Sequence, residues 1–394
     1  MRAVIRDLRD LLISLPLTVA LLGLSIVLVL VATLDQVNIG IWAVQQKYFH
    51  TFAVFTQVGN LSLAVFPGGY LLGGLLLVNV IGAFIYRFRF RWNKLGIHLT
   101  HVGLILLLLG ELFSGLWQED YHMRLDVGET RNYAESFRAV ELVLTDVTAP
   151  EVDDVFAIPE SQLARRRSVQ HPLLPFRVVP QSYFGNAQIR TRNGPATSSA
   201  HTGEIAVDTG TGRQLLAIAQ PMTYKQNERN VPAAGVQLVG PSGPIGTWLV
   251  SPFLEEPQVF EYEGRSWTVA LRFARHYQPF SLTLLKFMHD RYPGTNIPKN
   301  FSSLLRLSTP DGQDDREVLV YMNNPLRYGG LTFYQSGFDN DDRTSILQVV
   351  RNPSWQVPYI ACVVMSLGLA IQFCLHLGRF ARRRPTPAPS PALP

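Results

Sequence analysis

The stretch WNKLGIHLTHVGLILLLLGELFSGLW, residues 92–117, predicts a membrane-spanning helix. About 20 consecutive apolar residues cross the hydrocarbon core of a bilayer, and residues 95–116 are long enough. Two histidines, His98 and His101, lie near the end of the span that follows the basic sequence RFRFRWNK. They are three residues apart and therefore share one face of the helix. An ionisable side chain inside a span is costly to bury and usually faces a partner or a cavity, so the pair is a candidate functional site.

The composition of the 394 residues predicts a few spans and one large soluble domain. Hydrophobic residues make up 47% of the chain, and the mean hydropathy is +0.11, which is high for a soluble protein and low for a wholly membrane-embedded one. Three further segments satisfy the length rule: 13–33, 69–87 and 354–378. A cleaved signal peptide is the alternative for 13–33, because basic residues precede its apolar core. That core is long for a signal peptide, and no clear small-residue cleavage site follows it.

The basic residues indicate the orientation of these spans. Eleven of them flank one side of the predicted membrane: Arg2, Arg6, Arg9, Arg87, Arg89, Arg91, Lys94, Arg379, Arg382, Arg383 and Arg384. The region 117–353 holds 23 basic and 26 acidic residues and is close to neutral. The positive-inside rule therefore places both termini and the 87–94 loop in the cytoplasm. The net charge of +5 is a topology signal and does not indicate a nucleic-acid surface.

The segments between the spans complete the predicted domains. Residues 1–117 form an N-terminal membrane region with spans 13–33, 69–87 and 95–116. Its aromatic segment 37–66 is expected to lie on the membrane as an interfacial helix. Within 118–353, short alternating runs such as GEIAVDT and REVLVYM predict antiparallel strands. The fold class is thus membrane α plus β: four transmembrane helices, with a large exoplasmic, mostly antiparallel β domain between the third and fourth. Residues 379–394 form a basic, proline-rich cytoplasmic tail.

Several kinds of chemistry are not expected. The two cysteines, Cys362 and Cys374, both lie in the last span and form no Cys-x-x-Cys, so thiol–disulfide exchange and thiolate zinc sites are disfavoured. The histidines of the β region show no metal-ligand spacing: His122, His171, His201, His276 and His289. No Gly-x-Ser-x-Gly, His-Glu-x-x-His or P-loop motif occurs. We predict no catalytic residue and no self-contained active site.

Several stretches carry a family resemblance. ATLDQVNIGIWAVQQKYFH follows the first span and HLTHVGLILLLLGE is the third. FMHDRYPGTNIPKNFSSLLRL and YMNNPLRYGGLTFYQSGFD close the β domain. In sequence and in the order of its parts, the chain resembles the ResB-type cytochrome c biogenesis proteins, the CcsB half of the system II haem exporter and cytochrome c synthase. The resemblance extends over most of the chain and is weakest over about 150–260.

The resemblance implies a function and partners. Such proteins pair with a CcsA/ResC-type membrane protein in the bacterial inner membrane and handle haem b in transit. The pair attaches haem to the Cys-x-x-Cys-His of apocytochrome c, while thiol-reducing proteins nearby keep the substrate cysteines reduced. The partner's tryptophan-rich loop is absent here, so the chain would be at most one subunit of a haem lyase. The large domain would be periplasmic.

The resemblance also implies a ligand. A third-span histidine of this family binds haem iron, and the pattern places it at His101, directly before Val-Gly-Leu-Ile, with His98 as the alternative. A helix–helix hydrogen bond is the plainer interpretation of either residue. Haem propionates would lie toward the basic residues of the 87–94 loop, although the positive-inside rule alone explains those residues. His376 on the last span is a third candidate, for which a plain interfacial position is favoured.

Two other classes of function remain open. The chain could be a non-enzymatic scaffold, whose β domain recruits apocytochrome or a partner and whose histidines only pack helices. In that class Tyr328, Phe333 and Tyr334 are candidate contact residues, although aromatic side chains in strands more often belong to a core. A transporter or receptor is disfavoured, because four spans without broken helices make a poor solute pathway. Haem content distinguishes the first class from the scaffold.

Overall fold

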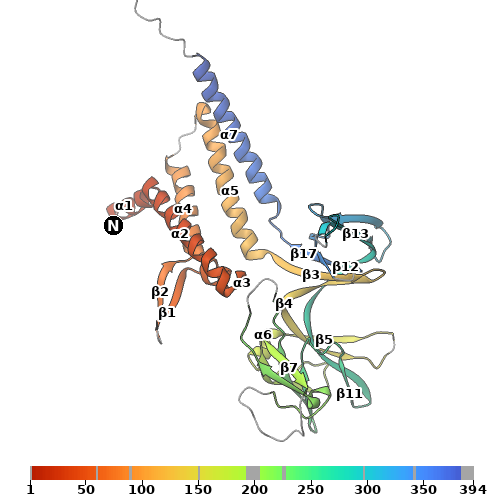
Figure 1. Ribbon diagram of the computed structural model, residues 1–394. Helices are drawn as coiled ribbons and strands as arrows, with labels where there is room; N and C mark the ends of the chain where they lie inside the picture. The colour runs from red at the N-terminus through yellow and green to blue at the C-terminus, as the bar shows by residue number, and fades with distance from the viewer. Residues whose placement is uncertain are drawn as a thin grey trace, which may run out of the picture. The chain divides into compact units, whose positions relative to one another are not determined.

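The computed structural model describes residues 2–58, 61–87, 91–149, 151–191, 205–223, 228–295, 298–339 and 343–382. The chain forms two compact units (Figure 1). Residues 1–118 and 352–394 make up the helical unit, and Glu119–Arg351 make up the β unit. Four helices are long and apolar enough to cross a membrane, and the strand ladders of the β unit are antiparallel. The predicted fold class is therefore confirmed.

The four long helices of the helical unit lie close to the predicted spans. They are α2 (Leu15–Ile39), α4 (Gly69–Arg87), α5 (Leu95–Trp117) and α7 (Gln356–Arg382). The short elements are α1 (Arg2–Leu12), α3 (Ile41–Val44), the π-helical turn η1 (Gln45–Phe49) and the 3-10 turn η2 (Trp92–Lys94). Ser14 caps α2, because its Oγ accepts a hydrogen bond from the Leu17 amide at 3.2 Å and a proline follows in the first turn.

The segment after α2 differs from the predicted interfacial helix. Residues 41–49 are helical, but β1 (Ala53–Val58) and β2 (Leu61–Pro67) then form an antiparallel hairpin. The helix prediction is wrong over these strands. AVFTQV and LSLAVFP are rich in β-branched and aromatic residues, which favour extended backbone, and a proline ends the second strand. The location of 37–66 at a membrane surface stays a prediction.

Asn79, the one strongly polar residue of α4, ties helices together as expected from its position in an apolar span. It is 1% exposed. Its Nδ2 donates to the carbonyl oxygens of Leu12 at 2.7 Å and Ser14 at 3.1 Å. Its Oδ1 accepts from the Thr18 hydroxyl at 2.6 Å. The side chain therefore fixes the joint between α1 and α2 against α4.

The β unit is built on two very long strands, β4 (Thr130–Asp146) and β12 (Arg265–Arg291). A ten-stranded sheet runs in the order β14-β13-β12-β4-β3-β17-β16-β15, with β11 pairing β12 and β5 pairing β4. Its other members are β3 (Glu119–Asp126), β5 (Asp154–Pro159), β11 (Gln258–Tyr262), β13 (Pro298–Ser308), β14 (Asp315–Tyr321), β15 (Leu326–Tyr328), β16 (Leu331–Phe338) and β17 (Thr344–Arg351).

Two smaller sheets belong to this unit, and the larger one packs against the end of β4 and the beginning of β12. One has the order β10-β9-β6 and the other pairs β7 with β8. Their bounds are β6 (Arg177–Phe184), β7 (Ala187–Thr191), β8 (Leu215–Ala219), β9 (Ala233–Gly240) and β10 (Gly243–Val250). The short helix α6 (Glu160–Ala164) and the 3-10 turn η3 (Thr211–Gln214) complete the unit.

Two hydrophobic cores share the long strands. The first contains Trp248, Trp267 and Leu142, and the second contains Phe280, Phe333 and Leu305. Strand β12 contributes to both: Trp267, Val269 and Leu271 lie in the first core, and Phe280, Leu282 and Leu284 in the second. The ladder between β12 and β4 shifts register between Tyr277 and Leu282, which marks a bend between the two cores.

Candidate functional site

The helix that carries His98 and His101 packs closely against α7 along a row of glycines. Gly96, Gly103 and Gly110 recur every seven residues on α5. A Cβ on Gly96 would lie 2.6 Å from the Gly368 carbonyl oxygen, and one on Gly103 would lie 2.9 Å from the Ala361 carbonyl oxygen. Small residues on both helices therefore allow backbone-to-backbone contact, which is how helices associate in lipid.

Helices α5 and α7 run side by side (Figure 1), and polar contacts hold both ends of the pair. At one end the Asn352 amide donates to Ser114 Oγ at 3.0 Å. At the other end Arg379 donates to the Asn93 carbonyl oxygen at 3.5 Å. The α5–α7 pair is thus the framework on which the two histidines are mounted.

The histidines lie on the opposite side of α5 from the glycine row. At about 100° per residue, His98 is about 160° and His101 about 140° around the helix from Gly96. The two imidazoles are about 60° apart on that side. Helix α7 therefore does not cover them, and the face they share is the one that α5 offers to other parts of the membrane unit or to a partner.

His98 is buried between α4 and α5. Its side chain is 7% exposed, and its ring meets the Phe84 ring of α4 edge-on at 6.2 Å between centroids. The His98 ring therefore packs α5 against α4, and its role as the alternative haem ligand stays a prediction.

His101 is half-buried, one turn further into the span. Its Nδ1 lies 2.9 Å from the Ile97 carbonyl oxygen. A carbonyl oxygen can only accept, so Nδ1 carries the proton and the lone pair of the imidazole is on Nε2. Metal-binding histidines commonly have this arrangement, in which a backbone carbonyl fixes the tautomer and the other nitrogen binds the metal. The tautomer of His101 therefore suits a metal ligand, and its role as a haem ligand stays a prediction.

The structure describes only some of the basic residues that were predicted near the beginning of α5. Arg91 and Lys94 are exposed immediately before α5, and Arg87 is exposed at the end of α4. Arg89 lies outside the described residues. His376 is exposed on α7, in agreement with the interpretation of that residue as interfacial. The end of α5 that carries His98 and His101 is therefore the basic end of the span.

The β unit offers no metal site among the residues described. No group of three or more His, Cys, Asp or Glu side chains there is arranged to hold an ion. His276 stacks on Tyr121 at 5.1 Å, and His289 lies 4.2 Å from the Phe338 ring. His201 falls outside the described residues. The single histidines of this unit are therefore packed against aromatic rings.

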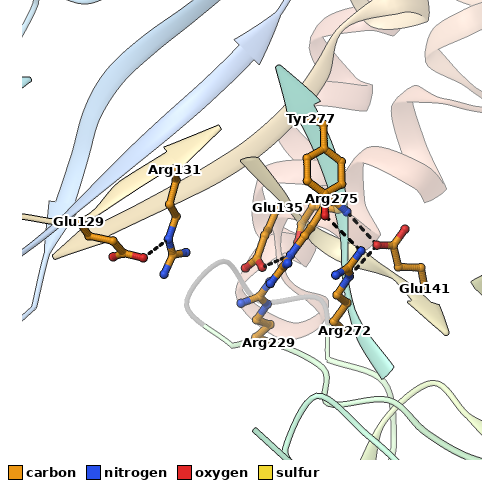
Figure 2. Close-up of polar contacts among 9 residues, drawn as sticks. Glu129, Arg131, Glu135, Glu141, Arg229, Arg272, Arg275 and Tyr277 are labelled. Atoms are coloured by element: carbon orange, nitrogen blue, oxygen red, sulfur yellow. Dashed lines mark hydrogen bonds and ion pairs between the residues drawn. The ribbon is translucent and has the colours of Figure 1, made fainter. Parts of the chain in front are cut away.

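Charged pairs join β12 to β4 at another register shift of their ladder, between Phe273 and Arg275 (Figure 2). The Arg272 Nε donates to Glu141 Oε1 at 2.9 Å, and the Arg275 Nε donates to Glu135 Oε1 at 3.2 Å. The guanidinium of Arg275 also lies 4.0 Å from the centre of the Tyr133 ring. Each cation in these pairs has an acid on the neighbouring strand, so the cluster joins β12 to β4 at the point where the ladder shifts register.

Arg229 and His122 lie beside this cluster. The Arg229 guanidinium sits 3.2 Å from the Phe273 ring centre and donates to the carbonyl oxygens of Ser136 and Phe137, both at 3.0 Å. Burial lowers the pKa of Arg229 to about 10. His122 packs its ring 5.0 Å from that of Phe137, and its buried Nδ1 has no hydrogen-bond partner among the described residues.

His122 gives the β unit a predicted pH dependence. Burial, and then the charge of Arg229, lowers the pKa of His122 below its ordinary 6.5. As pH falls through 6.5, the unfolded histidine takes up a proton before the folded one does, so the free energy of unfolding falls. We expect the thermal unfolding temperature of the β unit to drop between pH 7 and pH 5, and His122→Phe to flatten that slope.

The contribution of Asp146 lies mainly below this pH window. Thr148 lowers the pKa of Asp146 below its ordinary 3.8, so the stabilisation from that group is lost only as pH falls below 3.8. A slope between pH 7 and pH 5 that persists unchanged in His122→Phe would contradict the assignment to His122.

The comparison with known proteins identifies part of the β unit. Residues 256–346 match the model of the ResB-like family. This segment is ResB-like. The resemblance seen in the sequence is thereby confirmed, and the ResB-like segment contains β11 to β16 and the beginning of β17. The two stretches quoted from the end of the β domain lie within it, whereas His98 and His101 lie outside it.

Individual relatives match the chain over short lengths. Protein NrfI of Wolinella succinogenes is 37% identical over 91 residues, which is 23% of this chain and 10% of that protein. The cytochrome c biogenesis proteins CcsB of two Synechococcus strains, WH7803 and CC9311, are 38% and 36% identical over 78 residues. Those matches cover 20% of this chain and 17% of each CcsB. The chain thus matches less than a fifth of the length of these relatives.

The aromatic residues of the ResB-like segment divide between core and surface. Phe333 is fully buried in the second core, so it cannot serve as a docking residue. Tyr328 is half-buried and packs against Phe280 at 4.9 Å, while Tyr334 is 37% exposed. Only Tyr334 keeps the exposure that a contact residue needs.

The glycine row of α5 is the feature that the sequence analysis missed. Its signal was present, since Gly96, Gly103 and Gly110 repeat at seven residues in the third span. Ala361 and Gly368 have the same spacing in the fourth span. Matching small-residue repeats in two spans predict the pair and also indicate which face of α5 remains for the histidines.

Proposed function

We propose that the chain is a haem-handling membrane subunit of cytochrome c biogenesis. In this role it helps to export haem b and to present it for covalent attachment to apocytochrome c, together with a CcsA/ResC-type membrane partner. The observation that carries the proposal is the ResB-like segment, together with the two relatives named as cytochrome c biogenesis proteins CcsB. Haem is the cargo in this proposal.

The geometry of α5 supports His101 as the residue that holds the iron in transit. The Ile97 carbonyl fixes the tautomer that presents Nε2, and the side chain is on the face away from α7. An axial imidazole would hold the iron and set its electronic properties. His98, packed on Phe84, would orient the helix and is the alternative ligand.

The chemistry of attachment requires other proteins. Thioether formation needs reduced cysteines on the apocytochrome, and the only two cysteines of this chain are exposed on α7. Thiol-reducing proteins would therefore prepare the substrate, and the partner would supply the remaining residues of the reaction. On this proposal the chain is one subunit of a synthase.

The orientation that suits this role follows from the basic residues. The protein is multi-pass, with four candidate spans. We propose the bacterial inner membrane, with both termini cytoplasmic and the β unit periplasmic. A reporter that is active only in the periplasm should give a signal when it is fused within residues 205–223 or 228–295. A signal from a cytoplasm-specific reporter at the same positions would contradict the orientation.

The absorption spectrum of the purified complex tests the function. The protein is co-expressed with a CcsA-type partner, purified in detergent and measured oxidised and then reduced with dithionite. We expect the spectrum of a haem with imidazole ligation. A complex that contains no haem and still matures cytochrome c would place the chain in the scaffold class, in which its β unit recruits apocytochrome or a partner.

A further inference from the structure

The helix α1 is strongly amphipathic. At about 100° per residue, Val4, Ile5, Leu8, Leu11 and Leu12 fall within an arc of about 120°. The charged residues of the helix take the rest of the circumference, with arginines at positions 2, 6 and 9 and aspartates at 7 and 10. The helix therefore has one apolar face and one charged face.

The apolar face of α1 is not covered by the described part of the chain. Val4, Ile5, Leu8 and Leu11 are between 55% and 69% exposed. Four large aliphatic side chains on one helix face are costly to expose to water. Some apolar environment therefore covers this face.

The joint between α1 and α2 determines the position of the apolar face of α1 relative to the first span. Asn79 of α4 holds the carbonyl oxygens of Leu12 and Ser14, and Ile13 is buried at the joint. Helix α2, which begins at Leu15, is a candidate span. The end of α1 is therefore fixed at the point where the chain enters the membrane.

Arg9 links α1 to the end of α4. Its guanidinium lies 5.5 Å from the centre of the Tyr86 ring, next to the last residue of α4, Arg87. It also pairs with Asp10 at 2.7 Å, with both side chains exposed. Tyrosine and arginine at the end of a span are typical of the level of the lipid headgroups. Arg9 therefore holds α1 at the headgroup level.

We propose that α1 lies in the surface of the bilayer that α2 crosses. Its apolar face enters the boundary between headgroups and acyl chains, and its arginines face the lipid phosphates and water. Helices of this composition bind membranes in this way, with the apolar face about 5–10 Å below the surface. The occupant of the apolar face is the phospholipid bilayer itself, and this inference is independent of the haem proposal.

Two variants of the full-length protein, each with a single spin label, test the assignment. Cys362 and Cys374 are replaced by serine, and a label is placed at Leu8→Cys on the apolar face or at Arg6→Cys on the charged face. Each variant is reconstituted singly in nanodiscs of phosphatidylcholine and phosphatidylglycerol. Accessibility to dissolved oxygen, which concentrates in lipid, is compared with accessibility to a water-soluble nickel chelate.

The proposal predicts opposite results at the two positions. The label at position 8 should collide with oxygen and be shielded from nickel, at a depth of about 5–10 Å, while the label at position 6 should collide with nickel. Nickel access at both positions would place α1 in water and overturn the proposal. Shielding of position 8 from both reagents would show that a protein surface covers the face, such as a second copy of the chain, and would also overturn it.

Discussion

We expect the His101→Gly variant, purified with a CcsA-type partner, to lose its haem and to stop maturing cytochrome c. The proposed mechanism makes the His101 imidazole an axial ligand, and removing even the residues that orient a metal ligand typically costs about 10–100-fold in affinity. Glycine leaves space for a small molecule, so added imidazole should restore the absorption spectrum and part of the maturation. The measurement is haem per protein by absorption, with and without imidazole.

The matched variant is His98→Gly, three residues away on the same helix. His98 is buried against Phe84, so this change should reduce stability while the haem that remains keeps the spectrum of the unaltered protein. Imidazole should have no effect on it. If His98→Gly loses haem and imidazole restores it, while His101→Gly keeps its haem, the ligand is His98. If both variants and the double variant mature cytochrome c fully, neither histidine is a haem ligand.

Much of the architecture could be predicted because its signals are local. Each span is a continuous apolar run, and the strands of the β unit alternate along the chain. The isolated amide of Asn79 in an apolar span needs a partner, and it bonds to residues of α1 and α2 and their joint. Those inferences depend only on the residues within one element, and the structure confirms them.

The features that were missed depend on which elements meet. Alternation places Phe333 in a strand but does not say which face of that strand enters a core, so its burial could not be derived. Strand β12 enters two cores because of a register shift after Tyr277, and register is set by pairing partners rather than by composition. The near-helical spacing of aromatic residues that favours a helix belongs to Trp42, Tyr48, Phe49, Phe52 and Phe55, of which only Phe55 lies in the hairpin.

The candidate site, too, could be predicted from the sequence only in part. His98 and His101 are visible as candidates in the sequence, since ionisable residues are rare in spans. Their ranking came from the family resemblance and gains a physical reason from the structure, where one ring is packed on Phe84 and the other is set by the Ile97 carbonyl. The tautomer depends on the rotamer that brings His101 Nδ1 to the Ile97 carbonyl oxygen, and the face that α7 leaves to the histidines depends on the α5–α7 contact, so neither follows from the histidine positions alone.

We expect the Gly103→Leu variant to lose the close packing of α5 against α7. A Cβ at position 103 would lie 2.9 Å from the Ala361 carbonyl oxygen and 2.9 Å from the Met365 amide nitrogen. Both are backbone atoms and cannot rotate away, so the helices must separate. Overpacking of this kind costs about 1–3 kcal/mol in a well-packed core, and separating two helices along a glycine row should reach the upper end. The measurement is thermal unfolding of the detergent-purified protein.

Gly115→Leu on the same helix is the matched control, because a Cβ there meets nothing within 4 Å. It should leave the unfolding temperature unchanged or raise it slightly, since leucine favours helix over glycine by several tenths of a kcal/mol. The comparison also tests the site. If α7 positions α5, Gly103→Leu should lower haem content without removing any ligand, and added imidazole should not restore it. Equal unfolding temperatures for the two variants would mean that the glycine row does not hold α5 and α7 together.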